Sequence, residues 1–433
     1  MGRERPDEPR PAPRGEPLKT CRECHRLYSD DGGFCPIDGK ALLPTTEAQV
    51  PADAEDKRVG ATLCRGRYQI WRRVADGGMG RVYQALDLAE GRTVALKILH
   101  AEVAQDPVQV ERFKREFECS RALPHDHIVE VLAFEKTEDH SYALVMEYLE
   151  GEELRTLLKR EKVIPPERLI RMLSQAAIAL QAAHDRKIVH RDLKPDNIFL
   201  CGSTEGDRTK ILDFGSVRDN SAGAKKLTVM GTTIGSPFYM SPEQAQALPE
   251  LDHRADVWSM AAIAYECLTG TIPFRGTTGP SILLAILSHE PTPPSEAGKM
   301  HDVPATLDPV IEEALAKNPA IRIPTMGALV DRIGQAYGLE GSHTEWARTS
   351  QEELGARIRA GLPAALARYV ASPKAADLKG MDDAFKAGSE GGPSGAFQED
   401  MIMGVPSGPP KWIYAAVAVV AVLIGAGVVL LVR

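Results

Sequence analysis

Three residues within one short stretch have side chains that could together transfer a charged group. Asp192, Lys194 and Asn197 lie inside the segment 188–200, which is apolar at both ends. The carboxylate of Asp192 could accept a proton from a hydroxyl nucleophile, the ammonium of Lys194 could neutralise a phosphoryl group, and the amide of Asn197 could hold a metal ion. Each residue taken singly is typical of an ordinary loop, so the interpretation depends on their spacing.

The spacing of these residues is H-R-D-L-x-x-x-N, which is far more specific than its members. With this motif, residues 67–337 resemble the eukaryotic-type (Hanks-type) Ser/Thr protein kinases, particularly the bacterial membrane-anchored ones. The resemblance implies an α+β, bilobal protein kinase fold and transfer of the ATP γ-phosphate to hydroxyl groups of protein substrates. It also implies catalytic roles for Asp192, Lys194 and Asn197, and binding of Mg²⁺, or Mn²⁺, by Asn197 and Asp213.

A glycine-containing stretch, residues 74–83, is assigned to the ATP phosphates by the same resemblance. Gly77 and Gly80 would let backbone amides approach the phosphates without a side chain in the way. Ala75 stands where the family has its first glycine, and it is the smallest departure from that pattern. The backbone of residues 147–149 would bind the adenine. The residues assigned to ATP in this way are Ala75, Asp76, Gly77, Gly78, Met79, Gly80, Val82, Ala95, Lys97, Glu116, Glu147 and Leu149.

Lys97 lies in an apolar run, residues 93–98, where a charge is costly unless it is paired. The resemblance pairs this ammonium with the ATP phosphates and with Glu116, which lies on a helix predicted over residues 108–123. The alternative partners on that helix are Glu111 and Glu118.

Apolar periodicity indicates the elements that must hold these side chains in place. Residues 167–185 form a predicted amphipathic helix that leads into the catalytic stretch, and a predicted strand ends at Asp213. The resemblance adds two supports. One is an ion pair between Glu243 and Arg322, and the other is a cap on the backbone of the catalytic stretch from Asp256.

The polar stretch 216–235 has the position of an activation loop. Its candidate autophosphorylation sites are Thr228, Thr232 and Thr233, with Thr228 favoured by its position in relatives. Arg191 precedes the catalytic aspartate, and in the family such an Arg gains a strong anionic partner only when a phosphate or an acid arrives. We therefore expect activation by loop phosphorylation. The alternative is that these threonines are solvated residues without a role.

Composition bounds the class of protein. The chain has 433 residues, of which 43% are hydrophobic and 26% charged, an ordinary balance for a soluble domain. The net charge of −8 argues against nucleic acid as the main partner. The seven cysteines do not follow the pattern of a secreted disulfide framework. Residues 1–17 are charged and Pro-rich, which predicts disorder and no signal peptide, so the N-terminal bulk should stay in the cytosol.

Three cysteines cluster in residues 18–45, in two short knuckles whose spacing suits one tetrahedral Zn²⁺. An aspartate stands where a zinc ribbon would have its fourth cysteine, and His25 is the alternative fourth ligand. The segment is too short to bury a core, so a metal would be what folds it. The other hypothesis is a degenerate ribbon that no longer binds metal. The predicted zinc ligands are Cys21, Cys24, Cys35 and Asp38. Residues 46–63 follow as an acidic linker.

The rest of the chain, residues 64–433, divides into three parts. The kinase domain is expected over residues 64–337, and residues 338–410 read as a juxtamembrane region and linker. Residues 411–433 contain 21 consecutive residues without a charge, and at ~1.5 Å per residue such a helix spans a hydrocarbon core ~30 Å thick. This predicts a single-pass C-terminal membrane anchor with a cytoplasmic kinase domain. Ala421 and Gly425 form a small-xxx-small pair that predicts a homodimer.

The sequence therefore favours a Ser/Thr protein kinase that signals from the cytoplasmic face of a membrane. A second hypothesis, from another class, is a catalytically silent kinase-like membrane scaffold. It would need a lost catalytic residue, and Ala75 is the only departure in the expected ATP site. A third hypothesis makes the cysteine knuckle the working part, which recruits a protein partner that the kinase activity serves.

Overall fold

The computed structural model describes residues 56–203, 206–214 and 237–372, together with three short strands near the N-terminus. These strands form an antiparallel sheet in the order β2-β1-β3. The predicted zinc ligands and the predicted membrane segment lie outside the described residues. The three strands are β1 (Leu18–Thr20), β2 (Leu27–Ser29) and β3 (Leu43–Pro44).

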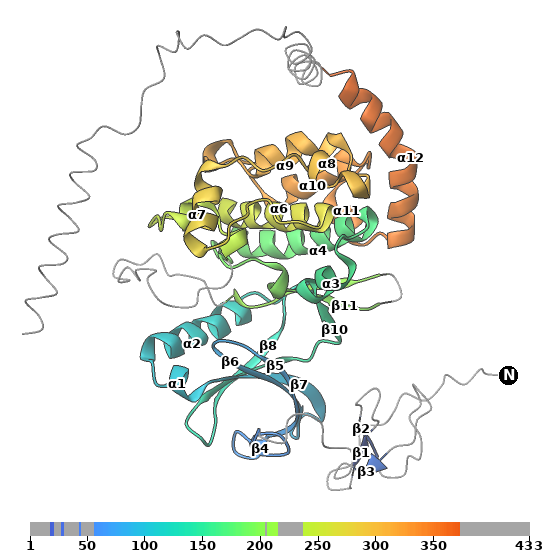
Figure 1. Cartoon of the computed structure of the whole chain (residues 1–433). Coiled ribbons are helices and arrows are strands. Elements are labelled where there is room, and N and C mark those ends of the chain that lie inside the picture. Colours follow the sequence, from blue (N-terminus) through green and yellow to red (C-terminus); the bar gives the residue numbers. More distant parts are fainter. Residues whose placement is uncertain are drawn as a thin grey trace, which may run out of the picture. The chain divides into compact units, whose positions relative to one another are not determined.

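The N-terminal lobe is a six-stranded antiparallel sheet in the order β4-β5-β6-β7-β9-β8 (Figure 1). The central strand β7 is almost wholly buried, as its run of branched apolar residues requires. Lys97 lies in this strand, opposite Val82 of β6 and Leu144 of β9. The strands are β4 (Thr62–Leu63), β5 (Tyr68–Asp76), β6 (Gly80–Asp87), β7 (Arg92–Leu99), β8 (Val131–Lys136) and β9 (Tyr142–Glu147).

Helix α2 (Pro107–Arg121) packs against β8 and β9 and follows the short helix α1 (Ala101–Ala104). Its first turn is stabilised by the side chain of Asp106, which accepts a hydrogen bond from Val108 N at 2.9 Å. Its buried face carries Phe113, Glu116 and Ser120, one helical turn or so apart. This face places the carboxylate of Glu116 towards the sheet.

The C-terminal lobe is mainly helical, and Figure 1 shows α4 (Pro166–Asp185) and α6 (Arg254–Thr269) side by side in its middle. Nearly every residue of α6 is buried, so this helix is the centre of the core rather than an amphipathic surface helix. The other helices up to residue 336 are α3 (Leu154–Glu161), α5 (Pro242–Ala245), α7 (Gly279–Ser288), α8 (Pro294–Ala297), α9 (Asp308–Ala314) and α10 (Met326–Ala336).

A small antiparallel sheet carries the catalytic segments. Its strands are β10 (Gly151–Glu153), β11 (Ile198–Cys201) and β12 (Arg208–Ile211), in that order. The catalytic loop leads directly into β11, and Asp213 follows β12. Ile211 also binds the loop before β8, because its N–H donates to His127 O at 2.8 Å and its carbonyl accepts from Val129 N at 3.0 Å. The strand β12, which Asp213 follows, is thus hydrogen-bonded to both lobes.

Two further helices extend the C-terminal lobe, α11 (His343–Trp346) and α12 (Gln351–Val370), and both pack against α4 and α10. Trp346 is fully buried, and Gln175 of α4 donates to Ala347 O at 3.0 Å while accepting from Thr209 N of β12 at 2.7 Å. The sequence suggested a domain boundary at residue 337. The compact unit instead continues to Ser372.

The N-terminal edge of the domain also differs from expectation. Residues 56–63, part of the stretch interpreted as an acidic linker, lie along β5 through hydrogen bonds of Gly60 N to Ile70 O (3.0 Å) and Ile70 N to Ala61 O (2.9 Å). Composition misled here because Asp56 is buried, although in the sequence it is one of several acidic residues in a stretch with few apolar ones.

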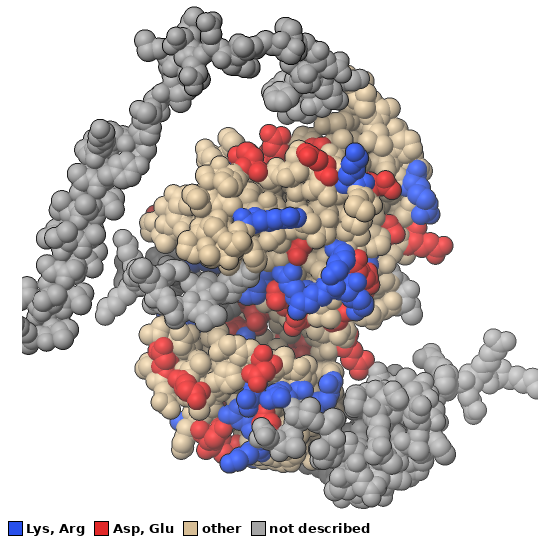
Figure 2. Space-filling model, viewed as in Figure 1, with Lys and Arg blue, Asp and Glu red and all other residues tan. Residues whose placement is uncertain are grey.

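Charged side chains of both signs are mixed on the molecular surface. Figure 2 shows Lys and Arg side chains beside Asp and Glu side chains on the face in view, which fits the modest net charge of −8. Within the part of the chain that the structure describes, no helix is both long and apolar enough to cross a membrane.

Candidate active site

Lys97 is the centre of a three-residue charge cluster between the lobes. Its Nζ donates to Glu116 Oε1 and to Asp213 Oδ1, both at 2.9 Å. Glu116 comes from α2, Lys97 from β7 and Asp213 from the end of β12, so the cluster joins three elements. The expected pairing of Lys97 with Glu116, rather than with Glu111 or Glu118, is therefore present, because Glu116 alone of these three glutamates is buried.

The pKa values of the two carboxylates in the cluster shift in opposite directions. Burial raises the pKa of Glu116 to about 7, although the Lys97 charge opposes this. Burial acts in the same direction on Asp213, but there Lys97 prevails and the pKa of Asp213 falls to about 2. The pKa of Lys97 is raised, because the two carboxylates outweigh the effect of burial. Asp213 is thus the carboxylate that stays ionised and suited to a cation.

The catalytic loop brings together the three residues that its spacing singled out. Lys194 Nζ donates to Asp192 Oδ2 at 2.7 Å, and Asn197 Nδ2 donates to the backbone carbonyl of Asp192 at 2.7 Å. Arg191 has a left-handed backbone, with φ of 66°, as has Asp213 with φ of 55°. Such conformations in non-glycine residues are strained and gather at functional sites.

Asp256 of α6 holds the backbone of this loop through hydrogen bonds, as expected. Its carboxylate accepts from the backbone N–H of His190 at 2.8 Å and of Arg191 at 2.9 Å, and it lies 2.8 Å from His184 Nε2. Burial alone would raise the pKa of Asp256, but the hydrogen bond from His184 and the other donors lower it. The side chain of His190 in turn donates to Leu212 O at 2.9 Å, next to Asp213.

Asn197 and Asp213 offer the donor set that Mg²⁺ prefers, an amide oxygen and a carboxylate. The amide nitrogen of Asn197 is used by Asp192, which leaves its oxygen as the free donor atom for a cation. The two residues are held near each other because Leu212 N donates to Asn197 O at 2.9 Å. The residues present therefore fit a hard, oxygen-bound cation.

The glycine-rich turn connects β5 and β6, and Gly77 N donates to Gly80 O at 3.0 Å across it. Gly80 is required for packing as well as for approach to phosphates, since a Cβ there would lie 2.2 Å from Ile98 O of β7. Ala75, the departure from the family pattern, is exposed and pairs with Val82. Because Ala75 is exposed, its methyl group fills no buried space that only a glycine would leave free.

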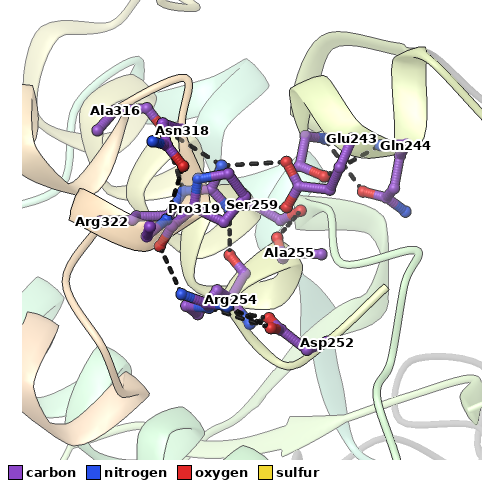
Figure 3. A network of polar contacts seen from close by, with 12 residues as sticks. Glu243, Gln244, Asp252, Arg254, Ala255, Ser259, Ala316, Asn318, Pro319 and Arg322 are labelled. Carbon is purple, nitrogen blue, oxygen red and sulfur yellow. Dashed lines mark hydrogen bonds and ion pairs between the residues drawn. The ribbon is translucent and has the colours of Figure 1, made fainter. Parts of the chain in front are cut away.

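The buried ion pair expected between Glu243 and Arg322 is present (Figure 3). Arg322 donates to both carboxylate oxygens, at 2.8 and 3.1 Å, and also to the carbonyls of Ala316 and Arg254. Glu243 lies at the start of α5, just after the activation-loop region. The pair ties the start of α5 to the segment that carries Arg322.

One contact behind β9 was missed by sequence reasoning. Lys210 of β12 donates to the carboxylate of Glu147 and, at 3.2 Å, to Ile128 O. Glu147 was assigned to adenine through its backbone only. Its side chain joins β9 to the strand that ends at Asp213. A lysine three residues before the metal ligand was the available signal, but its partner lies 63 positions away.

Several expected site residues lie outside the described part of the chain. These include the activation-loop threonines and the cysteine knuckle. Among the residues that the structure does describe, no group of three or more His, Cys, Asp or Glu side chains could hold a metal ion. The expected site residues that lie outside the described part are Thr228, Thr232, Thr233, Cys21, Cys24, Cys35 and Asp38.

A protein-family model for the protein kinase domain matches residues 68–332. The chain belongs to the protein kinase family. It is 36% identical over 270 residues to serine/threonine-protein kinase pkn3 of Myxococcus xanthus, a match that covers 62% of this chain and 49% of that protein. It is also 36% identical over 303 residues to serine/threonine-protein kinase PknB of Mycolicibacterium smegmatis, covering 68% and 48%.

A solved structure agrees with the bilobal fold. The PknI kinase domain of Mycobacterium tuberculosis superposes with a TM-score of 0.51 at 26% identity, covering 65% of this chain and 98% of that domain. The kinase domain thus resembles bacterial serine/threonine kinases. The chain spans about half the length of the curated relatives it matches.

Proposed function

We propose that this chain is an ATP-dependent protein kinase that phosphorylates Ser and Thr hydroxyls. The observation that carries the proposal is the cluster of Lys97 with Glu116 and Asp213, beside Asp192 and Asn197 of the catalytic loop. Every charged or polar group that phosphoryl transfer needs is present in one interlobe site. The named Ser/Thr kinases among the relatives support the choice of hydroxyl.

The residues divide the chemistry between them. Asp192 would orient the substrate hydroxyl and accept its proton, and Lys194, now 2.7 Å from Asp192, would neutralise the transferred group. Lys97 would hold the phosphates that replace part of its contact with Asp213. Asn197 and Asp213 would hold Mg²⁺, which when bound neutralises charge on the phosphates.

We further propose that autophosphorylation of the activation loop raises this activity. Thr228, Thr232 and Thr233 are the expected acceptors, and Arg191 beside the catalytic aspartate is the expected partner of the new phosphate. The position of these threonines, between Asp213 and the buried Glu243–Arg322 pair, supports this proposal.

Phosphate incorporation from ATP by the full chain with Mg²⁺ tests both proposals. The Asp192→Asn variant should lose incorporation by about 10²- to 10⁴-fold, the usual contribution of a positioned proton acceptor. Asp185→Asn, an exposed aspartate at the end of α4, is the matched control and should keep it. Mass spectrometry should place the phosphate on Thr228, Thr232 or Thr233.

Incorporation that is equal in parent and Asp192→Asn, or missing with both Mg²⁺ and Mn²⁺, would contradict kinase activity. That result would favour the membrane scaffold, the alternative from the other class. Phosphate on other residues with activity intact would refute only the loop proposal.

We propose also that residues 411–433 anchor the chain in a membrane through one C-terminal helix, with the kinase domain cytoplasmic. The support is their length and lack of charge. Flotation of the full chain with lipid vesicles, absent in a chain shortened to residue 410, is the expected result. Crosslinking in the vesicles would test the homodimer suggested by Ala421 and Gly425. Equal flotation of both chains would refute the anchor.

We propose finally that the cysteine knuckle binds one Zn²⁺. The support is the spacing of its three cysteines and an aspartate. Elemental analysis of the purified full chain should find close to one zinc per chain, and Cys21→Ser should remove it. A chain that contains no zinc after growth with zinc present would refute this proposal.

A further inference from the structure

The glycine-rich hairpin depends on side-chain contacts at its base for its position. Its turn, residues 77–80, is closed by a single backbone hydrogen bond of Gly77 N to Gly80 O. The last pair of its ladder is Asp76 opposite Arg81, and Arg81 Nε donates to Asp76 Oδ2 at 2.8 Å. Residues 76–78 are exposed, so packing alone does not hold the turn.

Asp56 reaches this base from outside the hairpin. Its side chain is 4% exposed and accepts from Tyr83 OH at 2.8 Å and from Arg81 Nη1 at 3.3 Å. Arg73 Nη1 lies 3.8 Å from the same oxygen. All three partners belong to β5 or β6. One buried carboxylate thus contacts side chains from both strands, and Arg81 connects it to Asp76 at the turn.

The segment that carries Asp56 is itself fixed. Val59 N donates to the backbone carbonyl of Asp56, and Arg58 N donates to its side chain, which closes a turn. Residues 60–63 then pair with β5. This segment precedes the residues that the family model matches, 68–332. The tie therefore joins Asp56, which lies outside the matched residues, to Arg81 and Tyr83, which lie inside them.

His100 holds the other side of the turn. It follows β7, its backbone N–H donates to Met79 O at 3.0 Å, and its Nε2 lies 2.8 Å from Gly77 O. Because a carbonyl only accepts, Nε2 must carry the proton. In a planar trans peptide the carbonyl and the next N–H point in opposite directions. The contact therefore fixes the direction of the Gly78 N–H, and Gly78 is one of the residues that the family resemblance assigns to ATP.

We propose that Asp56 and His100 are positioning residues for the nucleotide phosphates, which hold the glycine-rich turn from two sides. The inference rests on the proposed function, since it concerns the same ATP site. Preorganised amides bind a phosphate without first having to be ordered. Loss of either tie should weaken binding of ligands that carry phosphates, and should leave adenosine binding to the interlobe site unchanged.

Affinities of the full chain for ADP with Mg²⁺ and for adenosine, both by calorimetry, test the inference. Asp56→Asn and His100→Leu should each bind ADP about three- to tenfold more weakly, the effect of one or two lost hydrogen bonds, with adenosine affinity within about twofold of the parent. Lys57→Ala, an exposed neighbour, is the matched control for Asp56, and His100→Gln keeps a donor and should retain most of the ADP affinity.

Three outcomes would overturn the inference. Equal ADP affinity in the parent and both variants removes the positioning role. An equal loss of affinity for ADP and for adenosine would assign Asp56 and His100 to the stability of the lobe instead. The midpoint temperature of thermal unfolding would then fall in parallel. A parent chain that binds neither ligand refutes the proposed function, and this inference with it, whereas the first two results leave kinase activity standing.

Discussion

Two ion-pair networks support the two sides of the site, and they differ in their exposure to water. Glu243 and Arg322, in the C-terminal lobe, have side chains 8% and 0% exposed (Figure 3). Arg81 and Asp76, at the base of the glycine-rich turn, are 34% and 43% exposed. In the first network every N–H group of the Arg322 guanidinium donates to a protein oxygen. In the second network the charged groups are also accessible to solvent.

This difference fits what each segment has to do. A buried charge that loses its partner cannot recruit water, so the Glu243–Arg322 pair fixes one conformation. Exposed ions can exchange a partner for water at little cost, so the contacts of Arg81 bias the position of the hairpin without locking it. If the hairpin covers the nucleotide, as the proposed function requires, it must open to release the product, whereas the segment held by Glu243 need not move.

The largest effect is expected at the buried pair. Glu243→Gln leaves the Arg322 charge buried beside a neutral amide, and the free energy of unfolding should fall by about 3–5 kcal/mol. Urea unfolding of the full chain measures it. The matched control is Glu313→Gln, because Glu313 pairs with Arg332 in an exposed bridge with side chains 40% and 43% exposed. That variant should lose less than about 1 kcal/mol. Equal losses would remove the distinction between the networks.

A smaller effect is expected at the hairpin. A double-mutant cycle with Asp76→Asn and Arg81→Gln should give a coupling energy of about 0.2–1 kcal/mol in the free energy of unfolding. In about 1 M NaCl this coupling should nearly vanish, because exposed charges are screened there within a few ångströms. Coupling that persists at high salt would mean that the hairpin network is effectively buried, as the Glu243 pair is.

The smallest effect concerns Lys317, beside the buried network. Its Nζ lies 4.0 Å from the centre of the Phe274 ring, is buried, and has no hydrogen-bond partner among the described residues. Burial lowers its pKa from 10.5 to about 8, with Glu290 opposing and Arg322 adding to the effect. The folded state therefore releases this proton first. Stability from this group is gained as pH rises from about 8 towards 10.5 and is lost as pH falls through 8.

Lys317→Met should remove this increment. The difference in unfolding free energy between parent and variant, measured in urea at pH 7 and pH 10, should move in favour of the parent at the higher pH. Other titrating groups cancel in that difference. A difference independent of pH would mean that the aromatic rings hold the ammonium charged, since contact with a ring face stabilises the cation.

The residues of the catalytic centre could be predicted because their spacing is local or their element is strongly patterned. Asp192, Lys194 and Asn197 lie within one loop. Glu116 was chosen over its neighbours through the family resemblance, and the structure places it on the buried face of α2 with Phe113. The role of each in catalysis stays a prediction until it is measured.

The ties around the centre could not be predicted, because they depend on pairings between distant segments. Asp56 contacts Tyr83 in a structure where β4 pairs with β5, and Lys210 contacts Glu147 across the two lobes. A single acid or lysine has the same composition signal whether it is buried or solvated. Glu243 and Arg322 are distant too, and they were found only through the family resemblance.

The packing of α11 and α12 has a practical consequence for preparing the protein. A Cβ on Gly334 would lie 2.2 Å from the ring of Trp346, and one on Gly361 would lie 2.1 Å from Gly338 O, so these helices fit closely against the lobe. A fragment cut at residue 332, where the family match ends, would leave their apolar docking surface open to solvent. Such surfaces cause aggregation during expression. A soluble fragment should therefore run to residue 372.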